Sequence, residues 1–326
     1  MKTMNKWMLG LTGAAGGLTA AAAVHRGLLR KEQELLIPPG TMVEVNGHRM
    51  HVYGEGPVQR TLQETCQADA AGSRKIHRAK KVTLVFLSGG GTPAPVYDFR
   101  PLYRKLSPRF CCVVVEKAGY GYSDIDKCGR QLEGMLEETR LALRLAGEKG
   151  PFVLVPHSMS GLEALYWAQR YPAEILGIAG LDMAFPKVYD YLKTPPALMK
   201  LPGLIGVFGI HRYPFFQLVN HDGLTQEEYR QARLLANRNF MNPVIMEECC
   251  CIHANAETVR KHGRPDVPFL IFCSDGKDLG GFWVPLQKKY AKKLGGEFLP
   301  FSCGHYLHYY KAAEIAEAIR TFVEKI

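Results

Sequence analysis

The sequence predicts an α/β fold with a doubly wound, mostly parallel sheet. The apolar runs at 82–87, 110–116 and 152–155 have the pattern of strands that are buried on both faces. Segments with a helical period separate these runs, and strands that alternate with helices at this spacing form parallel sheets. A length of 326 residues with 47% hydrophobic and 22% charged residues suits one large globular domain with insertions.

The predicted elements begin with a β-hairpin. Residues 41–45 and 48–52 are its strands, because Asn46-Gly47 supplies the positive φ angles of a type I′ turn. The expected order then continues with strand 82–87, helix 96–106, strand 110–116, helix 131–146, strand 152–155, helix 161–171 and strand 175–181. The sheet resumes with strands 269–273 and 297–301, and a terminal helix is expected at 312–323.

Two segments interrupt this alternation. Residues 57–80 are polar and lack periodicity, so we expect a surface insertion there. Residues 183–263 contain no clear buried strand but have helical patches at 226–237 and 244–260 among many aromatic residues. We expect a helical cap at 183–263, inserted after the sixth strand, with the core formed by residues 40–182 and 264–326.

Residues 1–30 form an N-terminal segment with an uncharged, apolar stretch from Trp7 to Val24. Its length is marginal for a transmembrane helix, and Ala21-Ala22-Ala23 offers a signal-peptidase pattern. We therefore expect an uncleaved membrane anchor or a cleaved signal peptide, with the body extracytoplasmic, either membrane-anchored or secreted. A surface helix on a cytoplasmic protein is the alternative, favoured by the nine cysteines, which lack CxxC spacing and read as mostly free thiols.

The formal charge of +10 does not indicate nucleic-acid binding. The Lys and Arg residues are scattered, and no zinc spacing or other nucleic-acid module is present. The glycine-rich run Ser88–Gly91 lacks both the Lys of a P-loop and the G-x-G-x-x-G spacing, which argues against a nucleotide site. We expect no metal and no organic cofactor. We expect a solvated basic surface, with weak attraction to anionic membranes as the alternative.

The main chemical feature is Pro156-His-Ser158-Met-Ser160, which lies between an expected buried strand and an apolar helix. A sharp turn at such a junction exposes a nucleophilic hydroxyl above the strand end, and small neighbours keep the turn free of clashes. Pro156 and Ser160 stand where the G-x-S-x-G pattern has glycines. Ser158 is the expected nucleophile, and Ser160 is less favoured because it lies in the first helical turn.

With this elbow, the hairpin, the glycine-rich loop and the later Gly304-His305, the chain resembles the α/β-hydrolase fold family from about Gly40 onward. The resemblance implies a triad in the order Ser, acid, His, with Ser158 as nucleophile and His305 as base. His308 is a nearby rival for the base, but it lacks the preceding glycine.

Three aspartates are candidates for the acid. Asp278, after the strand at 269–273, is preferred, although the usual spacing falls one residue short of it. Asp275 is the second candidate. Asp182, after the strand at 175–181, is the third, because some members of the fold carry the acid there.

The resemblance also implies an oxyanion hole made by two backbone N–H groups. Met159, which follows the nucleophile, supplies one, and Gly90 in the glycine-rich loop supplies the other. Tyr120 and Tyr122 are expected in a structural turn, and the alternative is that Tyr120 or Tyr122 forms a wall of the site.

These features predict a serine hydrolase that cleaves an ester through an acyl-enzyme on Ser158. An aminopeptidase or amidase using the same triad remains open, with Glu247 and Glu248 as conceivable ligands for a substrate amine. A non-catalytic, membrane-tethered binding module is the alternative of another class. The expected partners are a small-molecule substrate with an apolar part and a membrane that the N-terminal segment reaches, while the oligomeric state is open.

Overall fold

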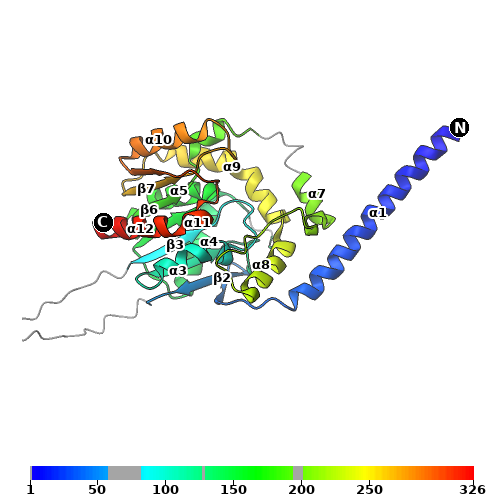
Figure 1. Ribbon diagram of the computed structural model, residues 1–326, viewed down its shortest axis with the longest axis horizontal. Helices are drawn as coiled ribbons and strands as arrows, with labels where there is room; N and C mark the ends of the chain where they lie inside the picture. Colours follow the sequence, from blue (N-terminus) through cyan, green and yellow to red (C-terminus); the bar gives the residue numbers. More distant parts are fainter. Residues whose placement is uncertain (1, 58–81, 127–128, 194–200) are drawn as a thin grey trace, which may run out of the picture.

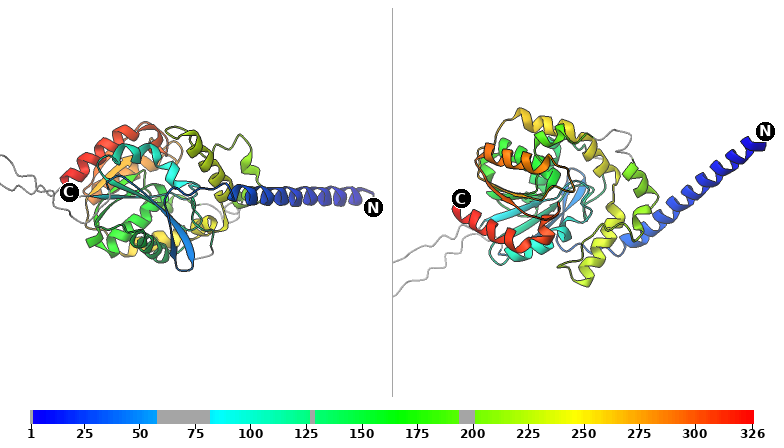
Figure 2. Two further views of the ribbon diagram at one scale, coloured as in Figure 1. Left: turned by 90° about the horizontal axis from the view of Figure 1, so that it is seen from below. Right: turned by 45° about the horizontal axis from the view of Figure 1, so that its top comes forward.

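A twisted eight-stranded sheet forms the centre of the protein, with helices on both of its faces (Figures 1 and 2). This architecture is that of a computed structural model, which describes residues 2–57, 82–126, 129–193 and 201–326, and only the backbone for residues 2–15. The surface insertion expected at 57–80 lies almost entirely outside the described residues.

The strand order is β1-β2-β4-β3-β5-β6-β7-β8. The strands are β1 (Thr41–Val45), β2 (His48–Glu55), β3 (Thr83–Leu87), β4 (Cys111–Glu116), β5 (Phe152–Pro156), β6 (Ile175–Leu181), β7 (Phe269–Cys273) and β8 (Glu297–Pro300). The pairs β1–β2 and β2–β4 are antiparallel, and all other neighbours are parallel. The predicted doubly wound, mostly parallel sheet is confirmed.

The β1–β2 hairpin has the register expected from its turn. Val45 pairs with His48, and Asn46 and Gly47 have φ angles of 50° and 89°. Both positive angles match a type I′ turn, whose twist suits the right-handed twist of the two strands.

The core has one hydrophobic cluster on each face of the sheet, because successive side chains of a buried strand point to opposite faces. In β3, Leu84 and Phe86 pack with α3 (Arg100–Leu106) and α12 (Ala312–Lys325). Val85 and Leu87 pack with the other cluster, to which α4 (Leu132–Leu145), α5 (Gly161–Arg170) and α10 (Trp283–Leu294) contribute. All five β3 residues are buried, as the continuous apolar run predicts.

The helices differ from the expectation in two places. The helix expected at 96–106 is divided into α2 (Pro95–Asp98) and α3, with Phe99 between them. Pro101 lies in the first turn of α3, where its missing N–H is tolerated, whereas it would interrupt a continuous helix. The helix α10 and the short α11 (Leu307–Tyr310) were not expected.

The described part of the insertion between β6 and β7, residues 183–263, contains helices and turns joined by irregular loops, such as 213–225, and no strand. It contains η3 (Pro186–Asp190), α7 (Leu201–Val207), η4 (Ile210–Arg212), α8 (Gln226–Asn239) and α9 (Pro243–Lys261). The α8 helix begins with a capping box, in which the Thr225 hydroxyl accepts from the Glu228 N–H and the Glu228 carboxylate accepts from the Thr225 N–H.

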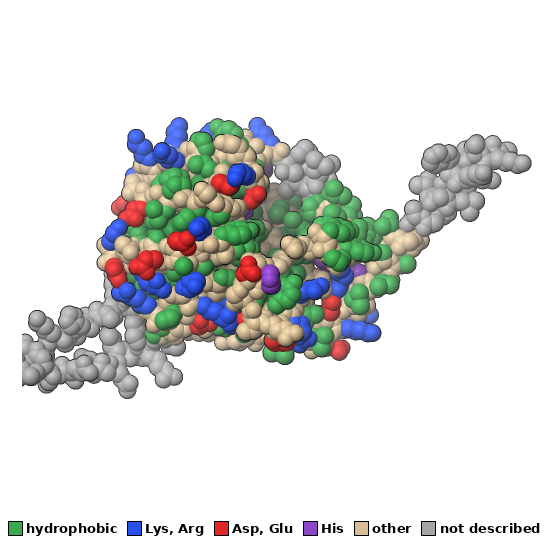
Figure 3. Space-filling view, in the orientation of Figure 1, with side chains coloured by type: hydrophobic (Ala, Val, Ile, Leu, Met, Phe, Trp, Pro, Cys, Tyr) green, Lys and Arg blue, Asp and Glu red, His purple; other side chains and the backbone are tan. Residues whose placement is uncertain are grey.

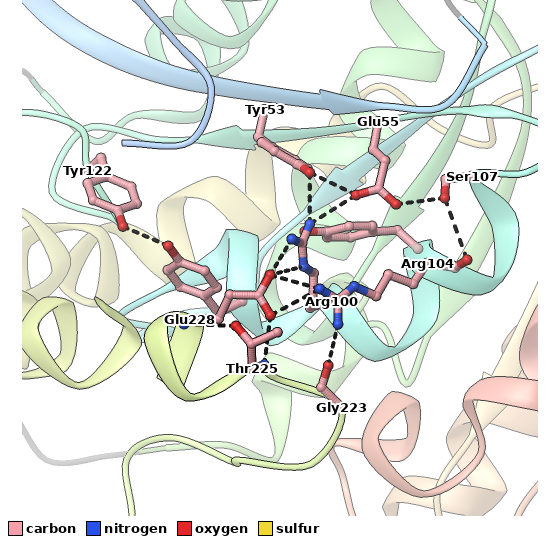
Figure 4. Close-up of polar contacts among 11 residues, drawn as sticks. Tyr53, Glu55, Arg100, Arg104, Ser107, Tyr122, Gly223, Thr225 and Glu228 are labelled. Atoms are coloured by element: carbon pink, nitrogen blue, oxygen red, sulfur yellow. Dashed lines mark hydrogen bonds and ion pairs between the residues drawn. The ribbon is translucent and has the colours of Figure 1, made fainter. Parts of the chain in front are cut away.

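A polar network fastens this insertion to the core (Figure 4). Glu228 of α8 accepts hydrogen bonds from Arg100 and Arg104 of α3, at 2.7 Å from Arg100 Nε and 2.9 Å from Arg104 Nη2. Arg100 also contacts Glu55 at the end of β2. The α8 helix is therefore held against the core by partly buried, charge-assisted hydrogen bonds.

The N-terminal segment forms one long helix, α1 (Lys2–Gln33), which extends away from the body (Figures 1 and 2). Its C-terminal end docks on the insertion, where Arg212 makes two hydrogen bonds of 2.7 Å with the Glu32 carboxylate and one of 2.8 Å with His25 Nδ1. Across the described part of the chain, no helix combines the length and the apolar character that a membrane crossing requires. The spanning anchor expected from Trp7–Val24 therefore finds no support in the structure.

Candidate functional site

The predicted site residues gather at the carboxyl edge of the parallel strands. Gly89–Gly91 follow β3, Ser158 follows β5, Asp182 follows β6 and His305 lies in the loop after β8. Because parallel strands end at the same edge of a sheet, residues that are distant in the sequence meet there.

Ser158 has the geometry of a nucleophile elbow. It begins the 3₁₀ turn η1 (Ser158–Ser160), separated from the end of β5 by one residue, and its φ angle is 53°. A positive φ is strained for a residue with a side chain. The 2.7 Å hydrogen bond from Ala184 N to the Ser158 carbonyl helps to hold this conformation.

Ser160, the alternative nucleophile, has a structural contact instead. Its hydroxyl oxygen is buried and lies 2.7 Å from the Leu87 carbonyl and 2.8 Å from the His157 carbonyl. The side chain therefore ties the start of α5 to the end of β3 and does not face His305.

His305 connects the nucleophile to an acid. Its Nε2 atom lies 2.8 Å from Ser158 Oγ, and its Nδ1 atom lies 2.7 Å from Asp182 Oδ2. Asp182 is fully buried, and its Oδ1 accepts from the Ser274 N–H at 2.9 Å and the Trp283 Nε1–H at 2.7 Å. These donors orient the carboxylate and supply the hydrogen bonds that a buried charge requires.

The preference for Asp278 as the residue that contacts the imidazole is wrong. Asp278 Oδ2 accepts from the backbone N–H of His305 at 3.1 Å, so Asp278 supports the loop and Asp182 holds the ring. Asp275 lies in a turn, where it accepts from Lys277 N at 3.1 Å and pairs with Lys277 Nζ at 3.0 Å. The acid that contacts His305 is the third candidate, the residue after β6.

The glycine-rich loop lies directly over the elbow. A Cβ atom on Gly89 would lie 2.9 Å from Ser158 Cβ, and one on Gly90 would lie 2.6 Å from Met159 Cε. The loop therefore needs glycine at these positions to approach the nucleophile, and it brings Gly90 and Met159, the two predicted oxyanion residues, into contact. Tyr120 supports the loop, since its hydroxyl accepts from Gly91 N at 3.3 Å.

Two further histidines lie beside His305: His157, to which the sequence analysis assigned no role, and His308, the rival for the base. The buried His157 ring lies 4.7 Å from the His305 ring and 4.9 Å from the His308 ring, centroid to centroid. Its Nε2–H donates to the His305 carbonyl at 3.2 Å, and burial together with these neighbours lowers the pKa of His157 well below its usual value. A neutral His157 therefore packs against the base without adding charge.

His308, the rival for the base, is turned toward another partner. Its Nε2 atom lies 3.1 Å from Asp98 Oδ2, and the Tyr309 hydroxyl donates to the same carboxylate. Asp98 belongs to α2, so this contact ties the His305 loop to the segment after the glycine-rich loop. Nothing in the sequence around His308 predicts its contact with Asp98.

A buried charge cluster lies behind the elbow. Lys117 Nζ lies 2.5 Å from Glu248 of α9 and 3.9 Å from Glu163 of α5. Burial raises the pKa of Glu163 above its usual range. The Tyr120 hydroxyl also donates to Glu248 at 2.8 Å. Glu248 is thus engaged by Lys117 and Tyr120, and it is not available as the conceivable ligand of a substrate amine.

A cavity of about 730 Å³ lies between the insertion and the core loops. Gly91 and Tyr306, which adjoin Gly90 and His305, are among its lining residues, together with Phe216, Phe240 and Tyr309. The volume suits a small organic ligand. Among the described residues, no group of three or more His, Cys, Asp or Glu side chains is placed to hold a metal ion.

Comparisons with known proteins agree with the fold. A family model described as the alpha/beta hydrolase fold matches residues 82–202, which include β3, the elbow and Asp182. The uncharacterized protein YbdG of Bacillus subtilis (strain 168) is 30% identical, and the match covers 93% of this chain and 91% of that protein.

Solved structures show the same fold at lower identity. An enol-lactonase from Burkholderia xenovorans LB400 has a TM-score of 0.58 and 15% identity, covering 87% of this chain and all of that chain. A putative lipase from Acinetobacter baumannii AYE has a TM-score of 0.60 and 16% identity, covering 92% of this chain and 96% of that chain. At these identities the likeness concerns the fold alone.

Proposed function

Because this chain belongs to the alpha/beta-hydrolase fold family, we propose that it is a serine hydrolase that cleaves esters through an acyl-enzyme on Ser158. One observation carries the proposal: His305 lies within hydrogen-bond distance of both Ser158 Oγ and Asp182 Oδ2, at 2.8 and 2.7 Å. This is the arrangement in which imidazole takes a proton from a serine and a carboxylate stabilises the resulting cation.

The mechanism assigns one task to each residue. His305 Nε2 removes the Ser158 proton as Oγ attacks the acyl carbonyl, and Asp182 holds His305 in the required tautomer. The N–H groups of Gly90 and Met159 stabilise the oxyanion. His305 then protonates the leaving alcohol, and a water activated by the same base releases the acid and frees Ser158.

The cavity supports a substrate with an apolar part. Its aromatic side chains, such as Phe216 and Phe240, favour apolar or aromatic groups, and its volume of about 730 Å³ exceeds that of a short acyl chain. We assign either the acyl group or the leaving group of the ester to this cavity.

Esters are favoured over peptides and other amides with a free amine. The conceivable amine ligand Glu248 is paired with Lys117, which leaves it without free charge for a substrate ammonium group. An aminopeptidase would need such an uncompensated carboxylate near the site.

The proposal is tested by stopped-flow hydrolysis of p-nitrophenyl butyrate and octanoate, with amino-acid p-nitroanilides as the amide comparison. We expect ester turnover with a burst of one nitrophenolate per active site if deacylation is slow, and loss of turnover by about a thousandfold or more in Ser158→Ala. Ser160→Ala is the matched control. Ester turnover that persists in Ser158→Ala would overturn the proposal, and a folded wild-type chain inactive on both substrate classes would favour the non-catalytic binding module.

A further inference from the structure

More than half of the large exposed hydrophobic side chains of the described residues lie in α1, α7 and the loop after η4. On α7, Leu201, Leu204 and Val207 recur at every third position, which places them on one side of the helix. Tyr213 and Phe215 follow η4, and Phe215 is 74% exposed. We call these five residues the α7 surface.

The α7 surface continues onto α1. The η4 turn joins the two, because Arg212 contacts His25 and Glu32 of α1, and the His211 ring lies 5.2 Å from the His25 ring. Leu18 lies seven residues before His25, on the same side of α1, yet it is 46% exposed. Figure 3 shows hydrophobic side chains gathered over α7, next to the place where α1 leaves the body.

The unpaired charges of the segments that carry this surface are basic, since the acidic Glu32 of α1 is paired with Arg212. Residues 2–31 and 201–219 contain no Asp or Glu. The exposed Arg26, Arg30 and Lys31 of α1 make no ion pair with any described residue. An apolar surface bordered by unpaired cations matches a bilayer with anionic headgroups, where the side chains enter the interface and the cations meet lipid phosphates.

We propose that the α7 surface and the adjoining side of α1 dock on an anionic membrane surface, without crossing it. A second copy of the chain is a poorer partner, because an isologous contact through this surface would bring the same unpaired cations together. The docked α7 surface would also place the cavity near the lipid, since Arg212, Tyr213 and Phe216 of the same segment line the cavity.

The test is co-sedimentation of the full chain with vesicles of phosphatidylcholine alone and of phosphatidylcholine with 30% phosphatidylglycerol, about a third anionic lipid. We expect binding to the anionic vesicles that weakens with added salt. Leu204→Asp combined with Phe215→Asp should reduce the apparent affinity by about tenfold or more. Leu145→Asp is the matched control, because Leu145 of α4 is as exposed as Leu204, 51% each, and lies outside the α7 surface.

Light scattering on the same proteins distinguishes the two candidate partners of the α7 surface, a membrane and a second copy of the chain. A monomer that binds anionic vesicles, with loss only in the α7-surface variant, supports membrane docking. No vesicle binding by the native chain, equal loss in Leu145→Asp, or a dimer that Leu204→Asp dissociates would overturn it. The assay needs no catalysis, so its outcome is independent of the ester-hydrolase proposal, and an unchanged circular-dichroism spectrum and thermal midpoint of the Leu204→Asp/Phe215→Asp variant show that its core is folded.

Discussion

The Oδ2 atom of Asp182 lies 2.7 Å from the Nδ1 atom of His305, a residue 123 positions away in the sequence. The two meet because β6 and β8 end at the same edge of the sheet, with β7 between them. Asp182 is also held by Ser274 and Trp283, whereas the Asp278 carboxylate accepts from the backbone N–H of His305 and not from its ring.

This arrangement predicts that Asp182→Asn and Asp278→Asn differ strongly. Asp182→Asn removes the charge that stabilises the His305 cation, so we expect kcat to fall by about a thousandfold or more. Asp278→Asn keeps an acceptor oxygen for the His305 N–H, and we expect less than about a tenfold loss. Steady-state kinetics on one ester checks both variants. A greater loss in Asp278→Asn than in Asp182→Asn would contradict the assignment of the acid.

The contact between the glycine-rich loop and the elbow predicts that a second substitution restores the activity lost in a first one. Gly90→Ala would place a Cβ atom 2.6 Å from Met159 Cε, which displaces either the side chain or the loop N–H. We expect kcat to fall by between about tenfold and a thousandfold, since complete loss of one oxyanion donor costs about 2.7–4 kcal/mol. Met159→Ala should be nearly neutral, because its proposed donor is the backbone. Combined with Gly90→Ala, it should recover most of the rate, and a double variant as slow as Gly90→Ala would show that the Met159 side chain does not cause the defect.

The elbow could be found from the sequence because its signal is local. A continuous apolar run precedes Ser158, a small residue, Ser160, stands two positions after it, and an apolar helix follows. The choice of acid could not be made in this way, because Asp182, Asp275 and Asp278 all follow strand-like runs. Two features that the sequence does not reveal place Asp182 beside His305. One is the register of β6 beside β5, and the other is the Trp283 indole of α10, a helix that was not expected.

The division of the helix expected at 96–106 shows a second limit of this approach. Apolar periodicity runs through Val96, Leu102 and Leu106, and all three side chains are buried. Pro101 nevertheless interrupts the hydrogen bonds of a continuous helix, and the chain restarts as α3. The burial of these core residues was therefore easier to predict than the boundaries of the helices that carry them.

The buried pair Lys117–Glu248 predicts a large loss of stability when one partner is removed. Lys117→Met removes the cation that pairs with the buried Glu248, and we expect the free energy of unfolding to fall by about 3–5 kcal/mol. Lys117→Met combined with Glu248→Leu should recover part of this loss. Urea denaturation measures both variants. Arg49→Ala, which removes an exposed ion pair with Asp124, is the control and should cost no more than about 1 kcal/mol. Equal losses in Arg49→Ala and Lys117→Met would contradict the role of burial.

The docking of α1 predicts a pH dependence through His25. Burial, together with the Arg212 guanidinium, lowers the pKa of His25 to about 4 from an ordinary value of 6.5. Between these values the unfolded chain binds more protons than the folded chain, so His25 stabilises the fold above pH 6.5 and this contribution falls as the pH drops toward 4. From pH 7 to pH 5 the loss amounts to about 2 kcal/mol at most.

His25→Asn isolates this effect from the other groups that titrate in the same range. The free energy of unfolding, measured at pH 7 and at pH 5, should fall less steeply in His25→Asn than in the native chain. An identical fall in both proteins would show that His25 is not held neutral by its contact with the insertion.

The most direct test of the central claim is labelling of the native chain, Ser158→Ala and Ser160→Ala with a fluorophosphonate probe, followed by mapping of the modified peptide by mass spectrometry. The account predicts that the native chain and Ser160→Ala carry the phosphonate on Ser158, because His305 activates that hydroxyl at 2.8 Å, and that Ser158→Ala carries none. Label on Ser160 or any other residue, or a folded native chain that the probe does not modify, would contradict it.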